Sequence, residues 1–240
     1  MQHYNSSVTE SAADARRIRG VVFDMDGTLV TPMNTYLQQM RRELSIPNGH
    51  GIVAYVEEYM HGDQRQAALR RIHEIEQEAL AHMQLSPGLI DLLRFLKDSN
   101  LPAAIITRNS MASVEHFLGE VVDRSVHASE RSLFAFHPII DRGFKPTKPS
   151  PASLLAVANE WGVEPSELMM VGDHVDDLLC GSRAGALAVL LRYQGNEKFA
   201  GAAHIVVDRI DELVGKLRDG FDVDLEAVGT VDPSSFYVTA

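Results

Sequence analysis

Short apolar runs recur along the chain, each followed by polar turn residues, and they predict the strands of a buried sheet. Runs without polar alternation are typical of parallel strands that are covered on both faces. The runs lie at 21–23, 103–107, 168–172, 187–191 and 204–207. Between them, apolar residues return at helical spacing, as in 89–96 and 150–161. This alternation of strand and helix predicts an α/β fold with a doubly wound parallel sheet.

Residues 31–85 interrupt the alternation, because successive helical patterns occur there without a strand candidate of comparable length. The last of these patterns spaces its apolar residues for one buried helix face. They are Leu69, Ile72, Ile75, Ala79 and Met83. We therefore expect a small α-helical cap inserted directly after the first strand. The predicted organisation is a flexible leader at 1–19, a core domain at 20–30 and 86–220, the cap at 31–85, and a tail at 221–240 without clear periodicity.

Composition narrows the function classes. The chain has 240 residues, 45% of them hydrophobic, which is enough for a sizeable core. The 22 Lys and Arg residues against 33 Asp and Glu give a formal charge of -11, which argues against a nucleic-acid surface. The single cysteine, Cys180, excludes an intramolecular disulfide, and we expect it to be a small buried helix residue. No membrane span or secretory signal is evident, so we expect a cytoplasmic protein, with no prediction of its oligomeric state.

Residues able to do chemistry gather where the predicted strands end. Ligands of open α/β sheets bind outside the carboxyl ends of the strands, so we expect these side chains to converge. They are Asp24, Asp26, Gly27 and Thr28 after the first strand, Thr107, Arg108 and Asn109 after the second, Lys148 in a later loop, and Asp173 and Asp177 after the strand at 168–172.

The aspartates at this edge raise a charge problem that indicates a cation. Asp24 and Asp26 are close enough to repel each other unless a cation or hydrogen bonds intervene. Together with Asp173 they supply oxygen ligands suited to Mg²⁺, and Lys148 adds a second positive charge. A carboxylate can attack phosphorus to form an aspartyl-phosphate. A phosphate monoester is itself anionic, so the attack requires these cations.

The ordered motifs resemble those of the haloacid dehalogenase superfamily, phosphatase branch. The chain carries DMDGT at 24–28, a threonine at the end of the second strand, KPSP at 148–151 and GDHVDD at 172–177. The resemblance implies that Asp24 is the nucleophile and that Asp26 is the general acid and then the base. It also implies that Mg²⁺ is held by Asp24, the backbone carbonyl of Asp26 and Asp173, with Asp177 nearby. Lys148 is implied to neutralise the nucleophile and the phosphoryl group.

The phosphoryl oxygens have their own candidate ligands. Gly27 lets the backbone approach a phosphate, and Thr28 either binds it or ties the loop. Thr107 matches the hydroxyl of the second motif, and Asn109 is a further candidate. Arg108 suits a phosphate or a substrate carboxylate, although an outward orientation is equally compatible with the sequence.

Several assignments near these motifs stay open at this point. Lys145 rivals Lys148, and we favour Lys148 because the prolines after it suit a helix start. Asp177 is either near the metal or a helix cap, and we expect Asp176 to be solvated. His174 replaces the small hydroxyl residue common in the family at this place.

The resulting hypothesis is a Mg²⁺-dependent phosphatase that hydrolyses a small phosphorylated metabolite, similar to phosphoglycolate phosphatases. The alternatives are a phosphomutase of the β-phosphoglucomutase type and a non-catalytic interaction protein with the same fold. The expected partner is a small phosphorylated substrate, with no nucleic acid and no membrane.

Overall fold

The computed structural model describes residues 2–5, 16–32, 34–47, 50 and 52–223. Its centre is a six-stranded parallel sheet in the order β5-β4-β3-β6-β7-β8. These strands are β3 (Gly20–Phe23), β4 (Ala103–Ile106), β5 (Ile139–Ile140), β6 (Leu168–Gly172), β7 (Leu187–Leu191) and β8 (Ile205–Val207). The doubly wound α/β prediction is thereby confirmed, and β5 is a strand that the apolar pattern did not identify.

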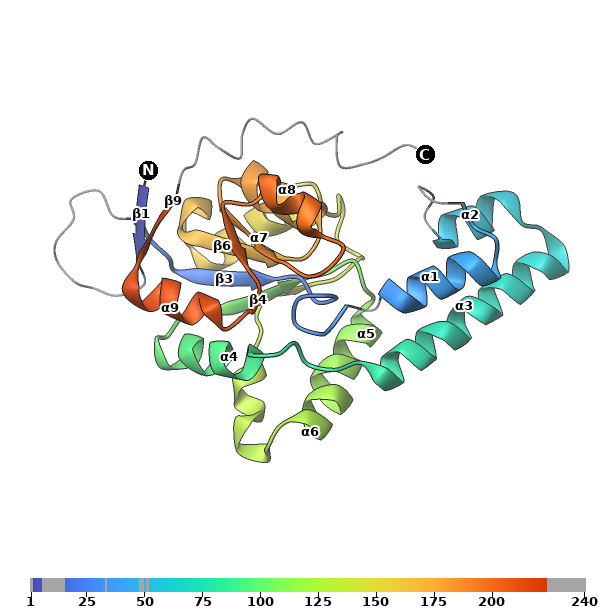
Figure 1. Ribbon diagram of the computed structural model, residues 1–240, viewed down its shortest axis with the longest axis horizontal. Helices are drawn as coiled ribbons and strands as arrows, with labels where there is room; N and C mark the ends of the chain where they lie inside the picture. The colour runs from blue at the N-terminus through green and yellow to red at the C-terminus, as the bar shows by residue number, and fades with distance from the viewer. Residues whose placement is uncertain (1, 6–15, 33, 48–49, 51, 224–240) are drawn as a thin grey trace.

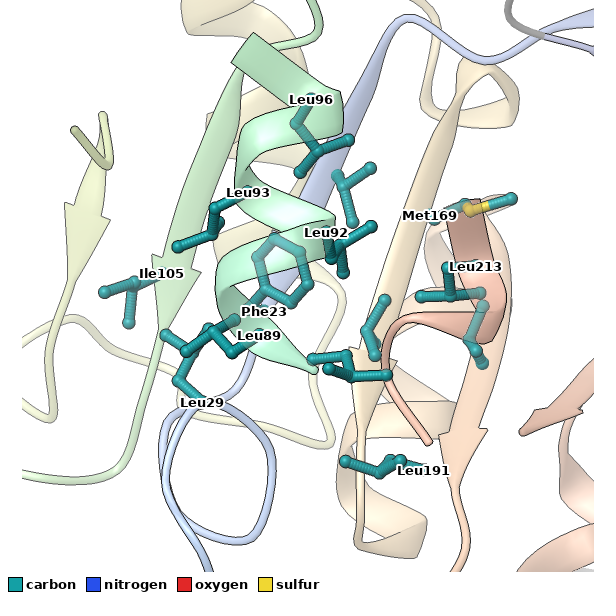
Figure 2. Packing of buried hydrophobic residues seen from close by; sticks show 14 of the residues in the cluster. Phe23, Leu29, Leu89, Leu92, Leu93, Leu96, Ile105, Met169, Leu191 and Leu213 are labelled. Carbon is teal, nitrogen blue, oxygen red and sulfur yellow. The ribbon is translucent and has the colours of Figure 1, made fainter. Parts of the chain in front are cut away.

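Both faces of the sheet are covered by helices, as the unbroken apolar runs predicted (Figure 1). Along β3, Val21 and Phe23 join the core on one face, while Val22 joins the core on the other. The first face packs against α4 (Leu89–Asp98) and α9 (Glu212–Asp219). The second packs against α7 (Ala152–Trp161) and α8 (Val175–Ala184). Figure 2 shows the leucines of α4 packed with Phe23 of β3 and Leu213 of α9.

The remaining elements of the core are shorter. They are α5 (Met111–His116), the π-helical turn η1 (Phe117–Val121), α6 (Val122–Ser125), and the 3-10 helices η2 (Ala128–Phe134), η3 (Pro165–Glu167) and η4 (Glu197–Ala202).

The prediction that Cys180 is a small buried helix residue is confirmed, since this residue of α8 is fully buried.

A helical segment lies to one side of the sheet (Figure 1), and in the sequence it falls between β3 and β4. It consists of α1 (Asn34–Glu43), α2 (Ile52–Tyr59) and α3 (Gly62–His82). These helices have a hydrophobic cluster of their own, which includes Met40, Val56 and Ile75. On α3 the buried face runs through Ala68 instead of the predicted Leu69, which is only partly buried. The chain leaves the core and returns to it at adjacent points, as the hydrogen bond from the backbone N–H of Thr31 to the Gln84 carbonyl shows.

The ends of the described chain form a small second sheet that the sequence analysis did not anticipate. Its strands are β1 (Gln2–Asn5), β2 (Arg16–Arg17) and β9 (Phe221–Val223), in the order β2-β1-β9. Ile18 of the predicted leader is fully buried in the core. The regular structure here arises from pairing between the two ends of the chain, which local periodicity does not reveal.

The strand order places a ligand site. From β3 the chain moves to β4 and β5 on one side, and then crosses to β6, β7 and β8 on the other. This reversal makes the carboxyl ends of β3 and β6 the topological switch point, where open α/β sheets bind their ligands. Among the described residues, no helix is both long enough and apolar enough to cross a bilayer.

Candidate active site

The turn after β3 brings Asp24 to the switch point. Its backbone N–H donates to the Val171 carbonyl of β6, which anchors the end of β3 to its neighbour. Gly27 then turns the chain with φ of 72°, in the left-handed region that favours glycine. A Cβ atom at Gly27 would lie 2.2 Å from Oδ2 of Asp173. Glycine is therefore required here both for the backbone conformation and for close approach of the β6 carboxylate.

Lys148 is the buried cation of the site. Its Nζ lies 2.6 Å from Oδ1 of Asp24 and 2.6 Å from Oδ1 of Asp177, and it donates to the Ile106 carbonyl at 2.8 Å. Burial opposes the charged form of this lysine, but the Asp177 and Asp24 carboxylates outweigh it and raise its pKa. Lys145 is exposed. The structure therefore brings the favoured lysine, and not its rival, to the aspartates.

A third carboxylate, that of Asp173, lies beside the two that contact Lys148. One oxygen atom from each of Asp24, Asp173 and Asp177 lies within 4.8 Å of the others. Burial raises the pKa of Asp24, helped by Asp177 and Asp173 and opposed by Lys148. Burial together with Asp177 raises the pKa of Asp173 to about 6. Hard oxygen donors that destabilise one another in this way fit a divalent cation such as Mg²⁺.

Asp177 serves the helix as well as the cluster, so both of its predicted roles are compatible. At the start of α8, the backbone N–H of His174 donates to Oδ2 of Asp177 at 3.0 Å, while Nδ1 of His174 accepts from the backbone N–H of Asp176. This reciprocal cap fixes the first turn. A Cβ atom at Gly172 would lie 2.2 Å from Cβ of Asp177, so glycine there lets the helix approach the strand end.

The raised pKa of Asp173 predicts how the stability of the metal-free protein depends on pH. A carboxyl group with pKa 3.8 when unfolded and about 6 when folded binds more protons in the folded state between these values. The contribution of Asp173 to the free energy of unfolding is complete below about pH 4 and is lost as the pH rises through 6. At about 1.4 kcal/mol per pH unit, the difference corresponds to roughly 3 kcal/mol.

We expect Asp173→Asn to remove this contribution, so that in EDTA its free energy of unfolding exceeds that of the wild type at pH 8 but not at pH 4. Mg²⁺ should stabilise the wild type more strongly at pH 8 than at pH 5, since the cation competes with protons. Urea denaturation across this range measures both effects. Asp208→Asn, at an exposed carboxylate, is the control. Equal slopes for Asp173→Asn and wild type would contradict the prediction.

Asp26 is held beside the cluster by the loop after β4. Nδ2 of Asn109 donates to Oδ2 of Asp26 at 2.8 Å. The other oxygen, Oδ1, is buried without a hydrogen-bond partner among the described residues. Burial raises the pKa of Asp26, and the hydrogen bond from Asn109 and the charge of Lys148 only partly oppose this. The site therefore favours the protonated form of Asp26 more than water does.

The end of β4 contributes two further predicted residues. Thr107 is buried, and its Oγ1 accepts from the backbone N–H of Asn109 at 3.1 Å. Arg108 donates from Nη2 to Oδ2 of Asp176 at 2.5 Å. The expectation that Asp176 is solvated is wrong, because its side chain is only 6% exposed. The reason is this long-range ion pair between the β4 loop and α8, which residue type alone does not indicate.

A cavity of about 1190 Å³ joins these residues to the helical segment. Predicted site residues that line it are Asp24, Asp26, Gly27, Thr107, Arg108, Asn109, Lys148, Asp173 and Asp177. Thr28 does not line it. Its side chain is fully buried, and its backbone N–H is used within the turn, donating to the Met25 carbonyl. The tight turn at Gly27 directs Thr28 into the protein, where its Oγ1 has no hydrogen-bond partner among the described residues. The structure therefore shows the hydroxyl neither at the cavity nor tying the loop.

Two residues after β7 support the site and were missed from the sequence. The hydroxyl of Tyr193 donates to Oδ2 of Asp173, and Nδ2 of Asn196 donates to the backbone carbonyl of Asp173 at 2.9 Å. Both follow a predicted strand, 187–191, at the same edge of the sheet. The strand-end rule that selected the aspartates would have found them if it had been applied to this strand as well.

The parallel sheet and the carboxylate cluster at its switch point define an α/β enzyme core. A family model for haloacid dehalogenase-like hydrolases matches residues 18–185, and the chain belongs to this family.

Individual relatives extend the similarity over most of the chain. A haloacid dehalogenase-like hydrolase domain-containing protein of Arabidopsis thaliana is 32% identical over 226 residues, covering 87% of each chain. Phosphoglycolate phosphatase 1 of Pseudomonas aeruginosa is 27% identical over 235 residues, covering 87% of this chain and 83% of the relative. Among solved structures, CbbY of Rhodobacter sphaeroides shares the fold with a TM-score of 0.62 at 23% identity, covering 84% of this chain and 99% of that one.

Proposed function

We propose that the protein is a Mg²⁺-dependent phosphatase that hydrolyses a small phosphorylated metabolite through an aspartyl-phosphate on Asp24. The observation that carries the proposal is the buried contact of Asp24 with Lys148, beside two further carboxylates at the switch point. An aspartate of this kind is a nucleophile whose charge is balanced by a fixed ammonium group. The similarity to phosphoglycolate phosphatase 1 of P. aeruginosa supports phosphate esters as the substrate class.

Asp24 starts the reaction. Lys148 holds its Oδ1, which leaves the second oxygen of the carboxylate to attack phosphorus. The new O–P bond forms as the bond to the leaving oxygen breaks, and the ammonium group offsets part of the charge on the phosphoryl oxygens. Thr107 and the backbone at Gly27 line the same cavity and are the proposed ligands of those oxygens.

Asp26 moves the protons. In its protonated form it donates to the leaving oxygen, so that an alcohol departs. As a carboxylate it then takes a proton from the water that attacks phosphorus, which releases inorganic phosphate and restores Asp24. Its raised pKa supports the first role, and the hydrogen bond from Asn109 orients the group for both.

The carboxylates that would hold Mg²⁺ are those of Asp24, Asp173 and Asp177. The family resemblance adds the backbone carbonyl of Asp26 to this set. When bound, the ion supplies positive charge that stabilises the anionic phosphoryl group and the crowded carboxylates. Tyr193 and Asn196 would keep Asp173 oriented toward it, as supporting groups do at metal sites.

The helical segment 31–85 is proposed to act as the cap over this site. The cavity runs from the aspartates to side chains of α1 and α3, including Tyr36, Met40 and Ile72. The substrate body would then lie between the core and these helices, and closure would exclude water from the phosphoryl group.

We expect release of inorganic phosphate from members of a phosphometabolite panel, with a loss of at least about 100-fold when EDTA removes Mg²⁺. Activity without any added bisphosphate distinguishes a phosphatase from a phosphomutase of the β-phosphoglucomutase type. A panel that includes an aryl phosphate, and that yields no phosphate with Mg²⁺ present, would sink the proposal in favour of a non-catalytic protein.

A further inference from the structure

The ion pair between Arg108 and Asp176 crosses the active-site edge of the sheet. Arg108 follows β4, Asp176 lies in the first turn of α8 after β6, and β3 lies between these two strands. The pair therefore bridges the strand end that carries Asp24. The atoms Nη2 of Arg108 and Oδ2 of Asp176 are 2.5 Å apart.

The two partners differ in exposure: the carboxylate is buried, and the guanidinium group faces the cavity. The Asp176 side chain is 6% exposed, whereas the Arg108 side chain is 49% exposed and lines the cavity. A buried carboxylate next to Asp177 adds negative charge to a crowded acidic site, which is unfavourable unless it is paired. Arg108 provides that pairing, and Asp176 in turn fixes an otherwise flexible side chain at the cavity wall. A guanidinium group has five N–H donors, so one bond to Asp176 leaves donors for a ligand.

The other cations of the described cavity wall are bound by the protein. Arg41 donates from Nη1 to the Pro47 carbonyl at 2.8 Å and from Nη2 to the His50 carbonyl at 2.7 Å. Lys148 is bound by Asp24, Asp177 and the Ile106 carbonyl. Both terminal nitrogens of Arg41 are thus engaged, whereas Arg108 uses only Nη2 among the described residues. Arg108 is therefore the guanidinium group with a free terminal nitrogen for a ligand in the described part of the cavity.

Acidic residues from other elements also line the cavity. Glu76 lies on α3, and Glu115 and Glu120 lie on α5 and η1. These carboxylates disfavour a negatively charged group in their part of the cavity, since like charges in a partly enclosed site repel. A second anionic group on a substrate would be drawn toward Arg108 instead.

We propose that Arg108, positioned by Asp176, determines specificity by binding an anionic oxygen on the leaving group. The substrates are then phosphate monoesters that carry a carboxylate or a second phosphoryl group close to the ester. The proposal rests on the phosphatase function proposed above. Planar guanidinium groups bind both kinds of oxyanion in a bidentate manner, which is why the class is defined by this shared chemistry.

The test compares three substrates with Mg²⁺: 2-phosphoglycolate, which carries a carboxylate, fructose 1,6-bisphosphate, which carries a second phosphoryl group, and phenyl phosphate, which carries neither. We expect Arg108→Gln and Asp176→Asn each to lower kcat/KM by about 10- to 100-fold for the anionic substrate that the wild type prefers, mainly through KM. The change for phenyl phosphate should stay below about 3-fold. The double variant should be no worse than Arg108→Gln, because the two residues act as one unit.

A matched control is Glu130→Gln, which removes a similar pair with Arg94 away from the cavity and should leave all three activities unchanged. Equal losses on phenyl phosphate would overturn the proposal, because Arg108 would then act on the transferred phosphoryl group. Additive losses in the double variant would overturn the positioning role of Asp176. If Asp176→Asn fails to fold, the substrate split in Arg108→Gln decides. A wild type that hydrolyses phenyl phosphate without preference for either anionic ester overturns only this inference, whereas no turnover on any of them contradicts the phosphatase function itself.

Discussion

Replacing Asp24 with asparagine is expected to lower turnover by about 10⁴-fold or more while the protein stays folded. The amide cannot form the O–P bond of the aspartyl-phosphate, so the loss should appear in kcat with every substrate that the wild type hydrolyses. Phosphate release under Mg²⁺ saturation measures this loss. A variant that retained activity within about tenfold would remove Asp24 as the nucleophile.

The fold of Asp24→Asn should survive because the substitution removes one of the crowded carboxylates. The pKa of Asp24 is raised by burial and by its acidic neighbours, so its negative charge is unfavourable in the metal-free protein. Lys148 keeps its contact with Asp177. Thermal denaturation in EDTA should therefore give a melting temperature close to that of the wild type. Asp208→Asn, which changes an exposed carboxylate paired with Arg192, should retain full activity.

The elements that local pattern defines could be predicted from the sequence. Each central strand except β5 was recognisable as an apolar run, because a parallel strand covered on both faces needs apolar side chains on both. The rule that strand ends face the ligand then placed Asp24 and Asp173 at one edge. β5 escaped because Ile139–Ile140 is too short to give a pattern.

Contacts between distant parts of the chain could not be predicted in the same way. Asp176 has the residue type and position of a solvated helix-start residue, and only the fold brings Arg108 to it from 68 residues away. Neither predicted role of the Thr28 hydroxyl is seen, for a related reason: the motif gives its spacing, but the turn at Gly27 decides which way the side chain faces. Such orientations depend on backbone geometry that a pattern of residue types does not specify.

Lys148→Met should destabilise the protein and abolish most of its activity. Methionine has a similar length but leaves the buried Asp24 and Asp177 without their ammonium partner, which typically costs about 3–5 kcal/mol. Loss of the charge beside the nucleophile is expected to lower turnover by about 10³-fold. Lys145→Met, at an exposed lysine three residues earlier, is the matched control and should change neither property.

The pH dependence of the Lys148→Met defect tests its electrostatic origin. Removing the ammonium group raises the pKa of Asp24 further, since Lys148 is the main influence that opposes its burial. A carboxyl group whose pKa is raised on folding stabilises the protein at low pH and loses this contribution as the pH rises through its folded value. The difference in unfolding free energy from the wild type in EDTA should therefore be small at pH 4 and largest at pH 8. A defect of equal size at both values would mean that Lys148 acts through packing of its alkyl chain, and the charge-balance account of this site would have to be abandoned.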